Sequence, residues 1–524
     1  MSKKPQRVLS SSLINDRAFW PSLPIQVQLP TSHSTRKRNG IAFGGGGQMS
    51  QAISGDMQAS ANGSGAEMYG VETHNAAAVA ELSACDGHAL HVTFGANACD
   101  VKLQVLNIVN PVYYVGERPT GPSWRRYLDL AEDPEVHFGT FHIPEGAWEV
   151  TVADGIATPQ DSATKLQADL RTGSVTSHLG RFAAFFNHRF QHGSHPFSVI
   201  PGTNFSCNGD HAAAAFRMIA EAWESNGFAP KGFVDYITTT VRYPNTMIDR
   251  ISVPANQRTR ELLEDLGLVG PTVVTEAARY FVIEENFGNN RRPYAEVPGL
   301  YYEPDAAGVR RWEDMKLRTL NAAHSVIASL GVLLGYGKEY GVFEAMQDPD
   351  IAALIDKIFA LVVPSLERPS RKDPKEFADE VKARLRNPNI PDNPFRIAMF
   401  ASDKIYPRFT SSMFTLLDQG VPSANLRPLA FAVACVLRYF VAVDDKGNEF
   451  VLADDKSSHV PPIRDNVALG SNANAFANII ADGRVMGRNL FELEHVGTSV
   501  QQMVGGMLRS PGAVRRMLQE VVAS

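Results

Sequence analysis

The chain has 524 residues, of which 44% are hydrophobic and 20% charged, and its formal net charge is −6. This length supports two sizeable hydrophobic cores, and the composition is that of an ordinary globular protein. The mildly acidic balance excludes non-specific electrostatic binding to nucleic acid or to an anionic membrane surface. No apolar stretch reaches the length of about 20 residues that a membrane span requires.

The N-terminus and the cysteines indicate a cytoplasmic protein. Residues 1–35 are rich in Pro and Ser and are expected to form an irregular arm, and residues 1–12 lack an apolar signal core. The four cysteines show neither a CxxC pair nor metal-finger spacing, so we expect reduced, buried thiols. They are Cys85, Cys99, Cys207 and Cys435.

A glycine run follows a short apolar segment, residues 40–43, and precedes a helical pattern. This order of strand, glycine turn and helix is typical of a dinucleotide site, where glycines let a pyrophosphate approach the helix N-terminal amides. The cofactor-binding candidates in this turn are Gly44, Gly46, Gly47 and Gln48. The third glycine of the usual fingerprint is absent, so a plain flexible loop stays open as an alternative.

A second predicted strand covers residues 67–73, and Glu72 lies near its end. In dinucleotide-binding folds an acid in this place hydrogen-bonds the adenosine ribose. No arginine follows Glu72 closely, which favours NAD over NADP without excluding NADP. The alternative for Glu72 is an ordinary solvated carboxylate.

Further along the chain, Val-rich strand-like runs alternate with helical stretches, which indicates an α/β sheet with helical crossovers. From residue 311 the pattern is largely helical, and the helices expected there include 472–492 and 498–522. We therefore predict an α/β protein with a Rossmann-like NAD(P)-binding domain at residues 36–283. A mostly α-helical substrate-binding domain is predicted at residues 284–524.

The first helix of this second half carries the residue types of an active site. At about 100° per residue, an α-helix over residues 311–325 would place Glu313, Lys316, Asn321 and His324 within an arc of roughly 140°. One face would then carry an amine, an amide and an imidazole. The alternative is a surface lysine, a capped asparagine and a histidine satisfied in the core.

These side chains suit the oxidation of a secondary alcohol, which needs a base, a hydride acceptor and donors that hold the oxygen. Lys316 can be the base if desolvation and nearby positive charge, from Arg396 or Lys404, lower its pKa. Asn321 can donate to the same oxygen, and His324 can donate to a neighbouring hydroxyl or hold Lys316.

No metal is needed for this chemistry, because an ammonium and amide donors do the polarising work of a zinc ion. The sequence offers no convincing zinc-ligand set, since Cys207 and His211 form only a weak pair. We therefore expect a zinc-independent enzyme.

Residues 312–325, WEDMKLRTLNAAHS, resemble the signature Lys-Leu-Arg-x-Leu-Asn-Gly-x-His-Ser of the long-chain mannitol dehydrogenase family. This family contains polyol 2-dehydrogenases and hexuronate reductases. Three further stretches agree with family motifs in order and spacing. They are residues 243–251, 275–284 and 384–404.

The resemblance implies a role for each matching residue. Lys316 would be the acid/base, Asn208 and Asn321 would hold the reacting oxygen, and His324 would orient the substrate. The other matching positions would lie near the sugar hydroxyls or, for the last of them, near the nicotinamide. They are Asp249, Arg396, Lys404 and Glu145. Paired structural charges, or a turn carboxylate for Glu145, are the alternatives.

The departures from the family pattern lie in the first half: Gln48 follows the glycines, Pro144 precedes Glu145, and Gly209 follows Asn208. The predicted function is an NAD(P)-dependent oxidoreductase that interconverts a polyol or sugar acid with its ketose or keto-acid. One alternative is a hexuronate reductase in which Arg396 or Lys404 pairs with the carboxylate. A second alternative, prompted by the departures, is a catalytically weak sugar or nucleotide binder. The expected partner is a small molecule, and a monomer is slightly favoured.

Overall fold

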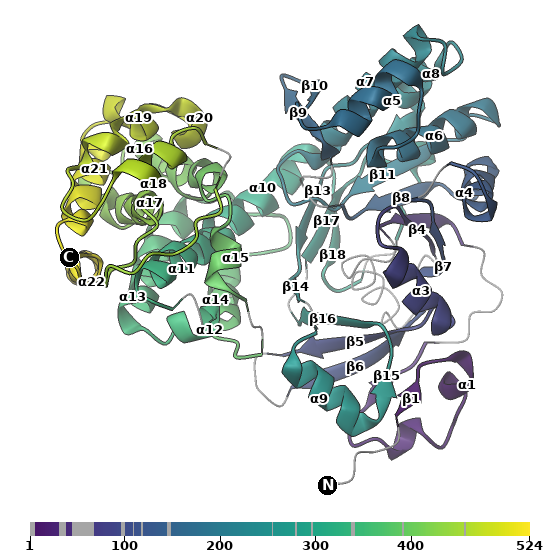
Figure 1. Cartoon of the computed structure of the whole chain (residues 1–524), viewed down its shortest axis with the longest axis horizontal. Coiled ribbons are helices and arrows are strands. Elements are labelled where there is room, and N and C mark those ends of the chain that lie inside the picture. Colours follow the sequence, from purple (N-terminus) through teal and green to yellow (C-terminus); the bar gives the residue numbers. More distant parts are fainter. Residues whose placement is uncertain are drawn as a thin grey trace. The chain divides into compact units, whose positions relative to one another are not determined.

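The computed structural model divides into two compact units, one ending at Arg310 and one running from Arg311 to Ser524 (Figure 1). Several short stretches of the chain fall outside the described residues. The described residues are 6–30, 38–44, 68–95, 100–107, 109–116, 119–143, 148–253, 255–277, 280–294, 297–336, 341–389, 392–454 and 457–524.

The first unit is built on a parallel sheet of six strands, in the spatial order β12-β11-β8-β3-β4-β7. The strands are β3 (Gly40–Phe43), β4 (Met68–Glu72), β7 (Val109–Tyr114), β8 (Phe138–Phe141), β11 (Phe197–Pro201) and β12 (Val241–Arg242). Counted along the chain within this sheet, the order is 6-5-4-1-2-3, which is that of the doubly wound dinucleotide-binding fold. The predicted α/β sheet is confirmed.

Helices connect these strands and cover the sheet. They include α3 (Ala76–Ala84), α4 (Pro122–Glu132), α5 (Thr164–Thr172), α6 (His178–Gln191) and α7 (Asn208–Ser225). The core between helices and sheet is aromatic: Phe43 stacks on Phe141, and Phe182 meets both rings edge-on. Strands that are buried on both faces need apolar residues at consecutive positions, which explains the Val- and Phe-rich runs.

Smaller sheets extend the first unit. A mixed sheet has the order β14-β16-β5-β6-β2, a three-stranded sheet has the order β13-β17-β18, and β9 pairs with β10 and β1 with β15. The bounds are β1 (Arg7–Val8), β2 (Val27–Gln28), β5 (Ala89–Phe94), β6 (Val101–Leu106), β9 (Val150–Ala153), β10 (Ile156–Pro159), β13 (Thr246–Asp249), β14 (Ser252–Val253), β15 (Leu268–Val269), β16 (Thr272–Glu276), β17 (Tyr280–Glu284) and β18 (Leu300–Glu303). Helix α1 (Ser11–Ile14) lies in the N-terminal arm, α8 (Phe233–Asp235) follows α7, and α9 (Gln257–Leu266) precedes β15.

The sequence-based domain limits differ from these units at both ends of the first domain. Within the arm, β1 and β2 pair with β15 and β6, so residues 6–30 contain regular structure. Strand β18 pairs in parallel with β17, and this pairing keeps the chain after residue 284 in the first unit. The units therefore divide at 310/311, within helix α10 (Ala306–Lys316), and not at the predicted 283/284.

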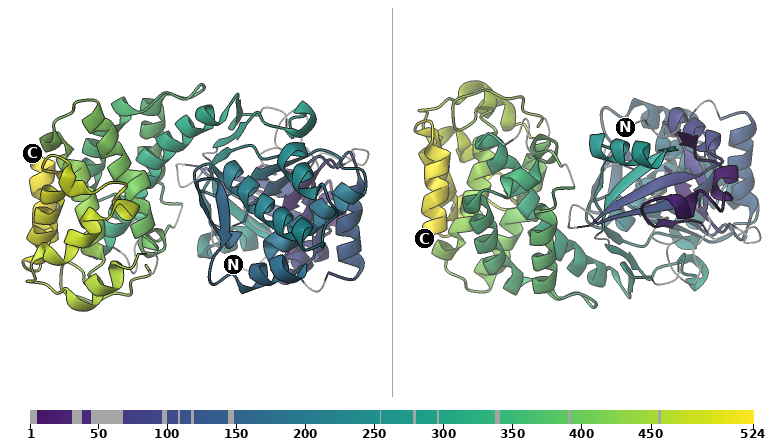
Figure 2. Two further views of the ribbon diagram at one scale, coloured as in Figure 1. Left: turned by 90° about the horizontal axis from the view of Figure 1, so that it is seen from above. Right: turned by 90° about the horizontal axis from the view of Figure 1, so that it is seen from below.

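The second unit is built mainly of helices and the loops that connect them, as both views in Figure 2 show for the green and yellow part of the chain. Its α-helices are α11 (Ala322–Leu333), α12 (Val342–Ala345), α13 (Pro349–Val362), α14 (Pro374–Leu385), α15 (Pro394–Ala398), α16 (Ser411–Asp418), α17 (Arg427–Tyr439), α18 (Val460–Asn466), α19 (Ala477–Ala481), α20 (Gly483–Met486), α21 (Val496–Leu508) and α22 (Ala513–Ala523). Helix α17 packs against α11 and α21, and nearly all of its residues are buried. Within the described residues, no helix is both long and apolar enough to cross a membrane.

Candidate active site

The helix that carries Lys316 is interrupted by a wide π turn. Helix α10 ends at Lys316, the π segment covers Leu317–Asn321, and α11 begins at Ala322. The backbone N–H of Ala322 donates to the carbonyl of Leu317, five residues earlier. The prediction of an uninterrupted α-helix was therefore wrong over these residues.

The π turn changes which side chains share a face. In an α-helix, residues five apart point about 140° away from each other, whereas a π turn of roughly 4.4 residues reduces this to about 50°. By the same count, Lys316, Asn321 and His324 fall within an arc of roughly 60°. The wide turn thus brings the amine, amide and imidazole closer together around the helix than a regular helix would.

This polar face is buried. Lys316, Asn321 and Glu313 are each only 7% exposed, and His324 is partly buried. Burying an ammonium costs free energy unless partners or a function compensate for the lost hydration. The burial contradicts the alternative of a surface lysine at position 316.

Arg408 holds the wide turn from a second π segment, Tyr406–Thr410. Its Nη1 donates to the carbonyl oxygen of Asn321 at 3.1 Å and to Ser325 Oγ at 2.7 Å. A π turn shifts the register of the backbone hydrogen bonds, and Arg408 gives the carbonyl of Asn321 a donor. This residue was missed from the sequence, because an arginine more than 80 positions away gives no local signal.

We expect Arg408→Met to lower kcat about 10- to 100-fold with a smaller change in KM, because the side chains of Lys316 and Asn321 lose their alignment. Arg408→Lys should recover part of the loss, since an ammonium can replace one of the two hydrogen bonds. The exposed Arg427→Met is the matched control. Equal kcat values for Arg408→Met and the control would show that the clamp is unnecessary.

The other two candidates in the second unit, Arg396 and Lys404, have structural partners. Arg396 Nε donates to Asp392 Oδ1 at 3.0 Å, and its side chain is 63% exposed. Lys404 Nζ donates to the carbonyl oxygens of Ile397 and Met399 at the end of α15. Both therefore support the local fold, and their contact with substrate stays a prediction.

In the first unit, Gly44 lies directly after β3, at the point where the strand order reverses. Its φ of +76° is strained for other residues, and a β-carbon there would lie 3.2 Å from the carbonyl oxygen of His142. The neighbouring ends of β3 and β8 form the edge at which such folds bind dinucleotides. Four predicted cofactor residues lie outside the described residues. They are Gly46, Gly47, Gln48 and Glu145.

Glu72 is the last residue of β4 and is 1% exposed, so the alternative of a solvated carboxylate was wrong. Its Oε1 accepts hydrogen bonds from the backbone N–H groups of Thr73 at 2.9 Å and His74 at 3.1 Å. His74 Nδ1 also lies 2.9 Å from the same oxygen. These contacts fix the carboxylate at the edge where the ribose-binding acid is expected.

Asn208, the first residue of α7, is bonded to Thr246 at the start of strand β13, and Asp249 is the last residue of that strand. The amide Nδ2 of Asn208 donates to the carbonyl oxygens of Thr203 at 2.9 Å and Thr246 at 3.0 Å, and its Oδ1 accepts from the Thr246 N–H at 2.9 Å. The amide therefore joins the start of α7 both to the loop after β11 and to β13. Asp249, 1% exposed, is three residues after Thr246, which places it roughly 10 Å along the strand from that residue.

The departure at Gly209 has a steric reason. A β-carbon at this position would lie 2.4 Å from the carbonyl oxygen of Tyr243 and 2.7 Å from the backbone nitrogen of Asn245. The N–H of Gly209 also donates to Asn245 Oδ1 at 2.9 Å. Only glycine lets the start of α7 approach this loop so closely.

His142 directly follows β8 and was also missed from the sequence. Its Nδ1 is buried and, among the described residues, has no hydrogen-bond partner, while the ring packs on Gly202 after β11. Burial lowers the pKa of His142 to about 4, so the imidazole is neutral at pH 7. A histidine immediately after the fourth strand of the sheet is the signal that could have identified it.

The low pKa of His142 predicts a loss of stability in acid. Between pH 6.5 and 4 the unfolded chain binds a proton at this residue and the folded chain does not, so stability falls as the pH drops. From pH 7 to pH 5, the wild type should lose about 2 kcal/mol more than His142→Gln. Urea denaturation at both pH values measures this difference, and parallel losses would contradict it.

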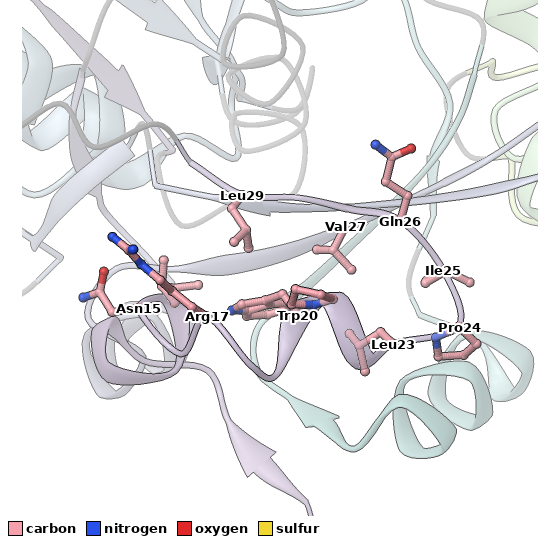
Figure 3. A pocket seen from close by; sticks show the side chains of 11 residues that line it. Asn15, Arg17, Trp20, Leu23, Pro24, Ile25, Gln26, Val27 and Leu29 are labelled. Atoms are coloured by element: carbon pink, nitrogen blue, oxygen red, sulfur yellow. The ribbon is translucent and has the colours of Figure 1, made fainter.

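A cavity of about 650 Å³ lies in the N-terminal arm (Figure 3). Trp20, Val27 and Leu29 contribute apolar side chains, and Asn15 and Arg17 lie at one end of it. None of the candidate residues lines this cavity, and we assign it no part in the chemistry.

Comparison with known proteins identifies the family. Residues 308–504 match the mannitol dehydrogenase C-terminal domain. A mannitol dehydrogenase of Saccharomyces cerevisiae is 30% identical over 360 residues, which are 68% of this chain and 67% of that protein. The chain belongs to the mannitol dehydrogenase family. The resemblance found in the sequence is confirmed, and the matched region contains Lys316, Asn321 and His324.

Other members of the mannitol dehydrogenase family extend the match. The D-mannonate oxidoreductase of Thermotoga maritima is 29% identical over 432 residues, 77% of each chain. The solved structure of Pseudomonas fluorescens mannitol 2-dehydrogenase, a ternary complex with NAD and D-mannitol, superposes with a TM-score of 0.79 at 22% identity. That match covers 99% of this chain and 100% of that chain. The predicted fold class, a Rossmann-like α/β region followed by helices, is confirmed.

Proposed function

We propose that this protein is an NAD-dependent oxidoreductase that interconverts a polyol or sugar acid with the corresponding ketose or keto-acid. The observation that carries the proposal is the buried amine of Lys316, grouped with Asn321 and His324 around a π turn. Wide turns of this kind are rare in proteins, and those that do occur are often found at functional sites. Family membership supports the same residues for the same chemistry.

The first unit fits a dinucleotide. Gly44 turns the chain after the first strand of the sheet, and the buried Glu72 ends the second strand. The residues that follow Glu72 are Thr73, His74 and Asn75. No arginine therefore follows Glu72 closely enough to bind the 2′-phosphate of NADP, which favours NAD as the cofactor. When bound, NAD would accept a hydride from the alcohol carbon.

The second unit would supply the proton chemistry. Lys316, as a neutral amine, would take the hydroxyl proton while the carbon is oxidised, and would return it in the reverse direction. The amide of Asn321 would donate to the oxygen, which is why its grouping with Lys316 matters. His324 would orient a neighbouring hydroxyl. Asn208, with its amide already bonded, would act by holding the start of α7.

The substrate class follows from the relatives, a D-mannonate oxidoreductase and mannitol dehydrogenases. Asp249 would accept a hydrogen bond from a sugar hydroxyl, and Arg396 and Lys404 would contact a hydroxyl or a carboxylate. A hexuronate reductase stays as the narrower alternative. We also propose a cytoplasmic location, in line with the free thiols of Cys85 and Cys435, and a monomeric state.

The test is absorbance at 340 nm with a substrate panel. NAD with D-mannitol, D-sorbitol and D-mannonate, and NADH with fructose and fructuronate, should give a signal with at least one pair, also in EDTA. A clear preference for fructuronate over fructose would select the hexuronate reductase. Calorimetric binding of NAD without any absorbance change over the panel would instead support the catalytically weak binder.

A further inference from the structure

Three potential metal ligands meet where two helices of the first unit end. His188 lies in the last turn of α6, His192 caps that helix one turn later, and Glu132 is the last residue of α4. Their nitrogen and oxygen ligand atoms all lie within 4.8 Å of one another, and His188 Nε2 is 2.8 Å from Glu132 Oε1. Figure 1 shows α4 and α6 near each other on the same unit.

The hydrogen bond made by His192 is of the kind that ligating histidines make. His192 Nδ1 lies 2.8 Å from the backbone carbonyl of His188, so it must carry the proton, and the lone pair is left on Nε2. A ligating histidine usually donates its other ring nitrogen to a carbonyl in this way. The two rings are stacked, with centroids 4.0 Å apart, which keeps both on one side of α6.

A buried arginine fixes the frame of the cluster. Arg189 is 0% exposed and donates to the carbonyl oxygens of Ala131 at 2.9 Å and Asp133 at 3.1 Å at the end of α4. It also donates to the carbonyl of His195, beyond the end of α6, at 2.9 Å. The two helix ends are therefore held together before any ion arrives. The guanidinium offsets part of the negative potential of these ends, so the carboxylate of Glu132 is needed to attract a dication.

We propose that Glu132, His188 and His192 bind one divalent transition-metal ion, with zinc as the representative ion. Two imidazoles and one carboxylate are ligands of Zn²⁺, Co²⁺ and Ni²⁺, whereas Mg²⁺ and Ca²⁺ prefer all-oxygen sites. The 2.8 Å spacing between His188 and Glu132 suits two ligands about 2.0–2.2 Å from one ion at a near right angle. Water would fill the remaining positions, because His192 and Glu132 are exposed.

The topology separates this site from the proposed chemistry. Helix α4 leads into β8 and α6 leads into β11, so the ends of both helices lie at the edge where these strands begin. Gly44 and Glu72 lie at the opposite edge, where parallel strands end. The ion would therefore connect α4 to α6 and stabilise the first unit, and hydride transfer would not depend on it.

The experiment uses the full chain without an affinity tag, stripped with a chelator and dialysed. Titration calorimetry with ZnCl₂ should show saturable binding of one ion, and Zn²⁺ but not Mg²⁺ should raise Tm. His192→Phe keeps the ring stack but removes a ligand, and Glu132→Gln removes the charge. Each should weaken zinc binding at least about tenfold. His195→Gln, three residues from the cluster, is the control and should bind like wild type.

No saturable zinc binding, or equal binding by wild type, His192→Phe and Glu132→Gln, would overturn the proposal. Thermal melts without metal show whether each variant is folded. Because His192 is exposed, we expect His192→Phe to fold, so that this variant tests the site even if Glu132→Gln unfolds. Turnover in EDTA distinguishes this proposal from the proposed function. A lower Tm in EDTA with unchanged kcat supports a structural ion. A lower kcat in EDTA would contradict the separation of the metal site from the proposed active site.

Discussion

Lys316→Ala is expected to lower kcat by about 10²–10⁴-fold, the range that a general acid–base supplies. The lysine would no longer take the hydroxyl proton, while the candidate cofactor residues Gly44 and Glu72 are unchanged in the first unit. NADH binding, measured by fluorescence titration, should therefore stay within about twofold of wild type. Lys316→Met, which fills the buried space, should show the same loss and excludes a packing effect.

The control for this variant is Lys375→Ala, an exposed lysine on α14 in the same unit. It should leave kcat and Tm within experimental error of wild type. If Lys316→Ala turned over at the rate of Lys375→Ala, the assignment of the base would be incorrect.

Asn321→Ala is expected to lower kcat by about 10²–10³-fold, as the removal of one donor to a developing oxyanion does. The loss should appear in kcat more than in KM, because the donor matters most when the oxygen gains charge. Arg408 bonds the backbone carbonyl of Asn321 and not its side chain, so the π turn should survive the substitution. Steady-state kinetics and a circular dichroism melt together measure both effects.

Asn466→Ala, at an exposed position of α18, is the matched control for the amide. In the double variant Lys316→Ala/Asn321→Ala, the losses should be smaller than the product of the two single losses, because both groups act on one oxygen. If Asn321→Ala lowered Tm and left kcat unchanged, the role of Asn321 would be structural and not catalytic.

The architecture was largely predictable from the sequence. Val-rich runs separated by helical stretches indicated the α/β sheet, and a glycine after the first strand of the sheet marked its ligand-binding edge. These features depend on local patterns, since burial on both faces demands apolar strands and tight turns demand glycine. The signature around Lys316 is equally local, and its residues alone were enough to indicate the family.

Helix interruptions in the second half were harder to predict. One helix was expected over residues 472–492, but the chain forms α19 and α20, because Asp482 caps a new helix and Gly487 adopts a φ of +81°. The helix expected at 498–522 divides at Gly512, with a φ of +77°. Apolar periodicity continues across such breaks, so periodicity alone cannot locate them.

The π turn at Leu317–Asn321 and its clamp by Arg408 depend on packing between segments distant in sequence, which no local pattern reports. The hydrogen-bond partners of Asn208 could not be predicted from the sequence either, since its amide donates to the carbonyl oxygens of Thr203 and Thr246. For Arg396 the sequence did contain a local signal. Asp392 lies four residues earlier, and opposite charges at this spacing often form an ion pair.

The most direct test of the central claim is the pH dependence of hydride transfer in a single turnover, followed at 340 nm with saturating NAD and substrate. The wild-type rate should rise with pH to a plateau, because only the neutral amine of Lys316 can accept the proton. Lys316→Ala should lose this plateau and respond only to hydroxide. An unchanged pH profile in Lys316→Ala would contradict the assignment of Lys316 as the proton acceptor.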